Sequence, residues 1–294
     1  MGSQHATSGL PPIRACLFDM DGLLLNTEDI YSLCANKVLA KYNRPPLPWS
    51  VKAKLMGVPG GSNGDVFHAW AQLPISREQY AREQAEHHAV HFPECEPLPG
   101  ATELLAHLTG GGRGGESAAA AAARNVDGRR VRVALASSTA TDNFALKTSR
   151  PAAKGLLDMI PENLRVLGDD PRVRPGRGKP APDIYLLALD TINAALREEN
   201  ADEPPITPAE CLVFEDSVPG VEAGRRAGMR VVWVPHEKLW EEWKDKAREV
   251  LAGRTGLVPE LGDEHQLGQL DDGWAERLET LEGFPYERFG IQGP

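Results

Sequence analysis

Five short apolar runs, rich in β-branched residues, recur along the chain, and each has the length of a buried strand. They are IRACLF at 13–18, VRVALAS at 131–137, LRVLG at 164–168, CLVFED at 211–216 and MRVVWVP at 229–235. Segments of helical character, such as 181–198 and 217–227, lie between them. Strands and helices that alternate in this way are typical of a parallel sheet covered by helices on both faces. The pattern therefore predicts an α/β fold.

The segment between the first two predicted strands is too long for a simple crossover. Residues 27–97 show helical periodicity, as in TEDIYSLCANKVLAKYN and SREQYAREQAEHHAVHF. We interpret them as a small helical domain inserted into an α/β core made of residues 1–26 and 98–294. The chain crosses twice between these domains, which makes a hinge, and clefts between domains are preferred ligand sites.

Two further segments lie outside the strand and helix alternation. Residues 109–128, TGGGRGGESAAAAAARNVDG, are of low complexity, and their glycines favour a flexible surface insertion without function. Residues 237–251, EKLWEEWKDKAREVL, are typical of one amphipathic helix. We expect the remainder to be a tail that packs on the core.

Composition narrows the classes of function. The 294 residues carry a formal net charge of -10 and no basic block interleaved with aromatics, which argues against a nucleic acid polymer as partner. A negative surface also disfavours anionic membranes, and no apolar run reaches membrane-spanning length. Cys16 and Cys211 lie inside apolar runs and no C-x-x-C spacing occurs, so buried free thiols in a reducing cytosol are expected. We expect a cytoplasmic monomer.

Polar residues follow three of the predicted strands where each strand ends. They are Asp19 and Asp21, then Ser137, Ser138 and Thr139, then Glu215, Asp216 and Ser217. Lys179, in GRGKPAPD, stands just before the helix that precedes the fourth strand. Ligands of open parallel sheets bind at the carboxyl ends of the strands, so these residues are expected at one edge.

The residue types at this edge indicate phosphoryl transfer. Four carboxylates in one cleft require a divalent cation in order to be ionised together, and oxygen ligands favour Mg²⁺. Lys179 and the metal would neutralise a phosphoryl group, while hydroxyls and backbone N–H groups at 137–139 bind its other oxygens. One aspartate is then free to attack phosphorus and the other to move a proton. Taken singly, the same residues are also explained as helix caps, an Asp-rich turn or a surface lysine.

These four segments resemble the motifs of the haloacid dehalogenase-like superfamily, in the same order. They are DMDGLLLNTE, LASST, GKPAPDIY and VFEDSVPGVEAGRRAG. The resemblance implies a Rossmann-like core and a helical cap at 27–97. It further implies that Asp19 is the nucleophile, Asp21 the general acid/base, and that Ser137, Ser138 and Lys179 bind the phosphoryl group. Mg²⁺ would be bound by Asp19, Asp216, Glu215 and the backbone carbonyl of Asp21.

Within the superfamily the chain is most similar to the pseudouridine-5′-phosphatases. The shared segments are VKAKLMG at 51–57, KTSR at 147–150, VLGDDP at 166–171 and FPYERFG at 284–290. The resemblance implies a small phosphorylated metabolite as partner, with pseudouridine 5′-monophosphate as the candidate substrate. Asn26 departs from the pattern, because these enzymes usually carry Asp at that place.

Two other functions compete with this interpretation. A sugar-phosphate phosphatase or a phosphomutase of the β-phosphoglucomutase kind shares the fold and the aspartates. A mutase must hold a second phosphate, which favours an arginine from the cap, and residues 55–65 contain none. Tyr31 also stands where the mutases tend to have His. A binding protein with an inactive phosphatase domain ranks last, because Asp19, Asp21 and Lys179 are all present.

Overall fold

The computed structural model describes residues 9–57, 60–111, 121–256 and 268–294. Within these residues, six parallel strands form one sheet in the order β3-β2-β1-β4-β5-β6. Their bounds are β1 Ala15–Phe18, β2 Arg132–Ala136, β3 Arg165–Val166, β4 Cys211–Glu215, β5 Arg230–Trp233 and β6 Ala275–Arg277. The expected α/β fold with a parallel sheet is confirmed. The sixth strand, at the edge of the sheet, was not predicted.

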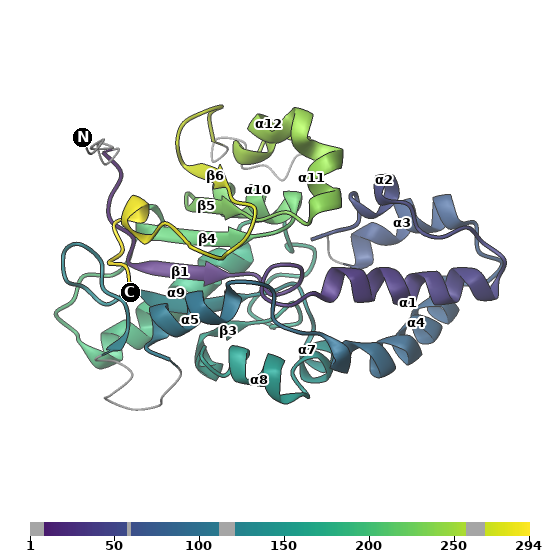
Figure 1. The fold of residues 1–294 in the computed structure, drawn as a ribbon, viewed down its shortest axis with the longest axis horizontal. Helices are drawn as coiled ribbons and strands as arrows, with labels where there is room; N and C mark the ends of the chain where they lie inside the picture. Colours follow the sequence, from purple (N-terminus) through teal and green to yellow (C-terminus); the bar gives the residue numbers. More distant parts are fainter. Residues whose placement is uncertain (1–8, 58–59, 112–120, 257–267) are drawn as a thin grey trace.

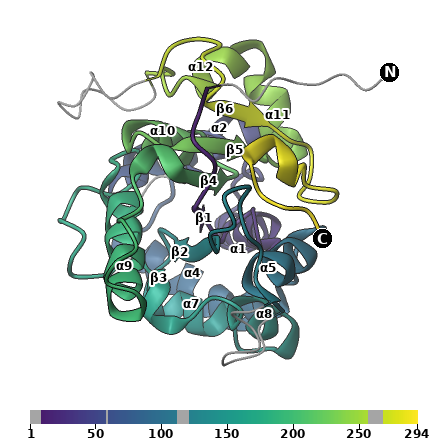
Figure 2. The same ribbon diagram turned by 90° about the vertical axis from the view of Figure 1, so that its left-hand side faces the viewer.

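The sheet is buried on both faces, which explains why its central strands read as continuous apolar runs. Along β1, Cys16 and Phe18 face one side, and Ala15 and Leu17 face the other. Helices α5 (Ala101–Thr109) and α8 (Pro151–Leu157) cover the first side; α9 (Asp183–Glu199), α10 (Val218–Arg226) and α12 (Ala247–Leu251) cover the second. Figure 2 shows the two layers from the end of the sheet.

Of the described helices between β1 and β2 in the sequence, the first four extend beyond the carboxyl ends of the strands (Figure 1). They are α1 (Thr27–Lys41), α2 (Trp49–Lys52), α3 (Gly60–Ala71) and α4 (Arg77–His91), and η1 (Phe92–Glu94) follows them. Val38, Leu39 and Phe67 form part of a separate small core among them. We call residues 27–97 the cap and residues 1–26 and 98–294 the core, as proposed domain bounds.

The two chain crossings between core and cap are bound to each other. The backbone N–H of Leu98 donates to the carbonyl of Leu24 at 2.9 Å. The side-chain oxygen of Asn26 accepts from the backbone N–H of Glu96 at 2.8 Å. Asn26 therefore supplies the acceptor that an aspartate would supply here, and it links the two crossings.

A third contact joins the cap to α11 (Glu237–Trp243) of the core. The Trp49 ring stacks on His236 with ring centroids 4.5 Å apart, and Met56 packs with the buried Leu239. The single helix predicted at 237–251 is divided here into α11, a 3-10 turn η4 (Lys244–Lys246) and α12. α11 packs on the cap through Leu239 and on the sheet through Trp240, and Val250 of α12 packs on the sheet.

The described part of the 109–128 segment is packed, although a flexible surface insertion was expected. Asn125 has no exposed surface, and its side-chain oxygen accepts from the backbone N–H groups of Asp127 and Arg129. The backbone N–H of Val126 donates to the carbonyl of Gly290 near the C-terminus at 2.9 Å. Residues 112–120 lie outside the described residues. The expectation of an inert loop therefore does not extend to 121–128.

The remaining elements are short. They are α7 (Thr141–Lys147), η2 (Glu162–Leu164), η3 (Pro208–Glu210) and η6 (Tyr286–Phe289). No helix in the described part of the chain is both long and apolar enough to cross a membrane.

Candidate active site

The carboxyl ends of β1 and β4 bring three buried acids together. The two strands are direct neighbours in the sheet, and the backbone N–H of Asp19 donates to the carbonyl of Phe214 at 3.1 Å. Carboxylate oxygens of Asp19, Glu215 and Asp216 lie within 4.8 Å of one another. Three of the acids that the sequence placed at this edge therefore meet, as the strand-end argument expects.

Lys179 joins this cluster from the loop before α9. Its Nζ lies 2.5 Å from Asp19 Oδ1 and 2.6 Å from Glu215 Oε1, and the side chain is buried. Burial alone would lower the pKa of Lys179, but the two carboxylates raise it above its usual value. Burial raises the pKa of Asp19 to about 7, and the Lys179 ammonium offsets only part of that effect. Lys179 thus stays a cation beside Asp19.

Glu215 is engaged by donors of the protein on both of its oxygens. Oε1 accepts from Lys179 and from the Tyr185 hydroxyl at 2.5 Å. Oε2 accepts from the backbone N–H and the hydroxyl of Ser217 at 3.2 and 3.1 Å. These four bonds use the acceptor capacity of a carboxylate. The geometry therefore favours Glu215 as the anchor of Lys179 over its expected role as a metal ligand.

Asp216 is placed differently from Glu215. Its Oδ2 is buried and has no hydrogen-bond partner among the described residues. Burial, followed by the charge of nearby acids, raises the pKa of Asp216 well above its usual value. A Cβ on Gly22 would lie 2.3 Å from this Oδ2, so only glycine leaves room for the backbone to approach it. A buried carboxylate oxygen without a partner is the donor that a hard divalent cation needs.

Asp21 lies in a separate cage of donors. Its carboxylate accepts from Thr27 Oγ1 at 2.7 Å, from Thr139 Oγ1, and from Lys147 Nζ at 2.6 and 2.8 Å. Burial alone would raise the pKa of Asp21, but the Lys147 ammonium and the hydroxyl donors lower it below its usual value. Lys147 and Thr27 had no predicted role, although Lys147 begins the KTSR segment that carries part of the resemblance.

The serines after β2 divide into two positions. Ser138 lines the cavity described below. Ser137 is fully buried, and its Oγ accepts from the backbone N–H of Thr139 at 3.3 Å. Both stand at the strand end where the sequence placed them, and Ser137 also orders the turn that presents Thr139.

The acids form the floor of a cavity of about 670 Å³ between core and cap. Asp19, Asp21 and Asp216 line its core side. Side chains of the cap line the rest, and they include Tyr31, Lys52, Phe67, His68, Arg77, Tyr80 and Gln84. Lys52 is itself bound to the Glu28 carboxylate at 2.9 Å. The cap thus closes over the strand ends with aromatic and polar groups facing the acids.

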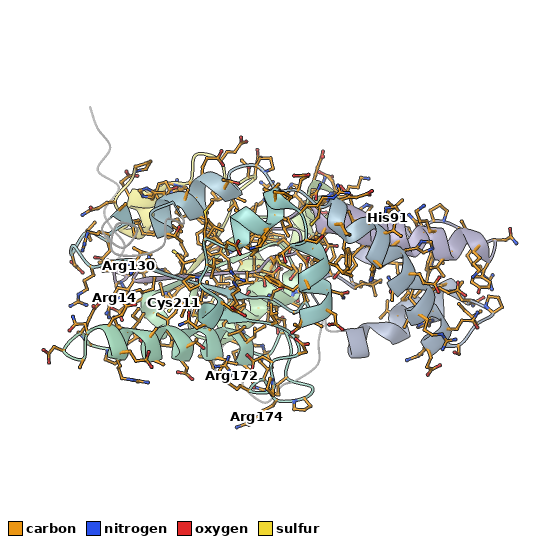
Figure 3. All side chains as sticks on the ribbon, turned by 90° about the horizontal axis from the view of Figure 1, so that it is seen from below. Arg14, His91, Arg130, Arg172, Arg174 and Cys211 are labelled. Atoms are coloured by element: carbon orange, nitrogen blue, oxygen red, sulfur yellow. The ribbon has the colours of Figure 1, made fainter. Side chains whose placement is uncertain are left out.

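Several arginines and the cysteines lie outside this cavity. Arg172 and Arg174 sit on the outer surface of the loop before Lys179 (Figure 3), and Arg172 pairs with Asp170 at 2.7 Å. All four cysteines are buried and free, and Cys211 lies with Arg14 at the end of the sheet away from the cap (Figure 3). Arg14, Arg172, Arg174 and Cys211 therefore do not line the cavity.

Comparison with known proteins identifies the family. A family model described as haloacid dehalogenase-like hydrolase matches residues 13–228. A probable pseudouridine-5′-phosphatase of Saccharomyces cerevisiae is 38% identical over 250 residues, which are 85% of this chain and 93% of that protein. The (DL)-glycerol-3-phosphatase 1 of Arabidopsis thaliana is 34% identical over 86% of this chain and 74% of that protein.

A solved structure shares the fold. It is a haloacid dehalogenase-type hydrolase of family IA from Entamoeba histolytica, with a TM-score of 0.56 and 20% identity over 79% of this chain and 89% of that one. The family model covers well over half of this chain, and both relatives above align over most of it. The chain therefore belongs to the haloacid dehalogenase-like hydrolase family.

Proposed function

We propose that the protein is a Mg²⁺-dependent phosphatase that hydrolyses a small phosphomonoester through an aspartyl-phosphate intermediate at Asp19. The observation that carries this proposal is the pairing of Asp19, on the floor of the cavity, with the buried Lys179, next to the unpartnered oxygen of Asp216. Lys179 occupies Oδ1 of Asp19, which leaves Oδ2 to attack phosphorus. We further propose that it acts as a cytosolic monomer.

In the first half of the reaction, Asp19 Oδ2 forms a bond to phosphorus while the bond between phosphorus and the ester oxygen breaks. Asp21 donates a proton to the departing oxygen. A phosphate that enters the cavity brings negative charge close to Asp21, which raises its pKa and favours the protonated form. Lys179 and Ser138 hold the phosphoryl oxygens during the transfer.

In the second half, a water attacks the phosphorus of the aspartyl-phosphate and gives its proton to Asp21, while the bond between phosphorus and Asp19 breaks; this releases phosphate and restores Asp19. Asp19, Asp216 and the backbone carbonyl of Asp21 would hold Mg²⁺. When bound there, the ion neutralises charge on the phosphoryl oxygens.

For the substrate we propose pseudouridine 5′-monophosphate. A cavity of about 670 Å³ is far larger than glycerol 3-phosphate needs and lies in the range typical of drug-sized ligands. Tyr31, Phe67 and Tyr80 supply apolar surface for a planar base, and Gln84 supplies an amide that can pair with its polar edge. The likeness to the yeast protein named for this substrate supports the same choice.

A phosphomutase remains the second candidate, and one observation favours it. The expectation of no cap arginine rested on residues 55–65, whereas Arg77 of α4 lines the cavity. A guanidinium in that position is suited to a second, non-reacting phosphate. A mutase would convert a hexose 1-phosphate into its isomer, whereas a phosphatase releases inorganic phosphate from it.

The test is release of inorganic phosphate from four compounds in the presence of Mg²⁺: pseudouridine 5′-monophosphate, uridine 5′-monophosphate, glycerol 3-phosphate and glucose 1-phosphate. We expect the highest kcat/KM for the first compound. Asp19→Asn should remove turnover, and Asp190→Asn on the exposed side of α9 should not. Equal kcat/KM for the two nucleotides would discard the substrate, and full activity of Asp19→Asn would discard the mechanism.

A further inference from the structure

Lys147 is a buried cation whose neighbours come from both the core and the cap. The residue ends α7, and its side chain has no exposed surface. Its Nζ donates to both oxygens of Asp21 and lies 2.9 Å from Thr139 Oγ1 and 2.9 Å from the Tyr31 hydroxyl. Thr139 belongs to the core, whereas Tyr31 lies on α1 of the cap.

Aromatic rings complete the surroundings of this ammonium. Nζ lies 4.7 Å from the ring centroids of both Tyr31 and Phe92, which is within the distance of a cation–π contact. The backbone carbonyl of Lys147 accepts from Cys95 Sγ in the second chain crossing. Helix α7 also lies beside the end of α4 (Figure 1). Lys147 is therefore fixed by the cap and by the crossing that carries it.

The position of Asp21 depends on this arrangement. Its other donors are Thr27 and Thr139, which are hydroxyls and bind more weakly than an ammonium. Among the described residues, Lys147 alone contacts both carboxylate oxygens at hydrogen-bond distance, so it fixes the plane of the carboxylate as well as its place. A proton donor must lie within hydrogen-bond reach of the atom that it serves, so this orientation bears on proton transfer.

We propose that Lys147 is the positioning residue for Asp21, and that Tyr31 couples this positioning to the cap. The proposal rests on the role of Asp21 in the proposed function. Lys147 holds the carboxylate next to the cavity, and the Tyr31 hydroxyl holds Lys147 only while α1 stands over the strand ends. Closure of the cap over a substrate thereby also sets the proton donor.

The test uses leaving groups that differ in their need for a proton. p-Nitrophenolate departs without protonation, whereas an alkoxide requires it. The alkyl ester is pseudouridine 5′-monophosphate or glycerol 3-phosphate, whichever the wild type hydrolyses faster. For Lys147→Met we expect kcat/KM to fall about 100-fold on the alkyl ester and less than about tenfold on p-nitrophenyl phosphate. Tyr31→Phe keeps the ring and removes the hydroxyl. Its kcat/KM should fall less than that of Lys147→Met, and again more on the alkyl ester than on p-nitrophenyl phosphate.

The matched control is Lys154→Met, because Lys154 is an exposed lysine on α8 that pairs with Asp158. This variant should leave both rates unchanged. An equal loss on both substrates in Lys147→Met, or no loss on either, would overturn the proposal. If Lys147→Met does not fold by circular dichroism, the ratio of the two rates in Tyr31→Phe decides in the same way.

Asp21→Asn separates this inference from the proposed function. If Asp21→Asn loses more rate on the alkyl ester while the Lys147 and Tyr31 variants do not, only the positioning role fails. If Asp21→Asn itself shows no preference between leaving groups, the acid/base role of Asp21 fails.

Discussion

Gly57 of the cap lies so close to Ser217 of the core that a methyl group added at Gly57 should push the cap away from the core. Its φ is +73°, and a Cβ built on it would lie 2.1 Å from Ser217 Oγ and 2.6 Å from Ser217 Cβ. Ordinary contact begins near 3.4 Å. Ser217 is held in place, because its hydroxyl donates to Glu215 Oε2 and accepts from the backbone N–H of Gly220. In Gly57→Ala the cap must therefore withdraw by about 1 Å, a displacement large enough to misplace reacting groups.

The magnitude follows from this displacement. A 1 Å misplacement costs about 100-fold in rate, and a left-handed alanine costs about 1–2 kcal/mol of stability. We expect kcat/KM for phosphate release, measured below saturation with Mg²⁺, to fall about 100-fold in Gly57→Ala. Thermal or denaturant unfolding should show the smaller stability loss.

Gly128→Ala is the matched control for Gly57→Ala. Gly128 has a φ of +77°, but a Cβ there meets no described atom within 4 Å. It should lose the same stability and keep its kcat/KM. The reasoning is refuted if Gly57→Ala retains wild-type kcat/KM, or if Gly128→Ala loses as much activity.

Three further predictions concern the metal, a buried histidine and the segment before β2. Chelation should abolish phosphate release and Mg²⁺ should restore it; Mg²⁺ should also raise the Tm of the wild type but not of Asp216→Asn, and an equal rise in both would contradict the site. Burial, and then the Lys147 charge, lowers the pKa of His88 from 6.5 to about 4, so its imidazole is neutral in the fold and charged in the unfolded chain below pH 6.5. The unfolding free energy of the wild type should thus fall by about 3 kcal/mol as pH drops from 6.5 to 4 because of this histidine. His88→Phe should lack this part of the pH dependence, and an identical pH dependence in wild type and variant would contradict the prediction. Replacing residues 112–120 by a short Gly-Ser turn should change stability little, whereas Asn125→Ala should cost about 1–3 kcal/mol in denaturant unfolding, because it removes the two hydrogen bonds that the side chain accepts from the backbone of Asp127 and Arg129.

The strands that the sequence predicted are those that both faces of the sheet bury. In β1 and β4 every position is buried, so the run of apolar letters is continuous and visible without any tertiary information. Strand β6 lies at the edge, and its Ala275–Arg277 positions are all half-buried. A three-residue strand that includes Glu276 and Arg277 has no apolar pattern, so it was assigned to the tail.

Composition misled the interpretation of residues 121–128 because their partners are remote in sequence. Glycine and alanine around them indicate a loop. The hydrogen bond from Val126 to Gly290, and that from the Gln292 side chain to the Asn125 carbonyl, join segments more than 160 residues apart. Such pairing is decided by the path of the C-terminal tail over α5, which no local pattern contains.

The site was predictable where the sheet alone determines position. Asp19, Ser138 and Asp216 stand at ends of adjacent strands, and parallel topology brings them to one edge. Lys147 and Tyr185 were not assigned, because each extends from a helix and its role depends on how that helix packs. Tyr185 sits in an apolar helix face that reads as core, yet its hydroxyl binds Glu215.

The pairing of charges around the cavity shows why the structure was needed to distinguish one carboxylate from another. Among the described residues, three lysines serve four acids: Lys179 contacts Asp19 and Glu215, Lys147 contacts Asp21, and Lys52 contacts Glu28. Asp216 is the fifth acid of this group, and it has no ammonium within salt-bridge distance in the described structure. The five carboxylates outnumber the three ammonium groups beside them, and a divalent cation next to Asp216 would offset that excess. The unpartnered oxygen of Asp216 shows where that cation would bind, because a buried charge without a partner is stable only when a counter-ion joins it.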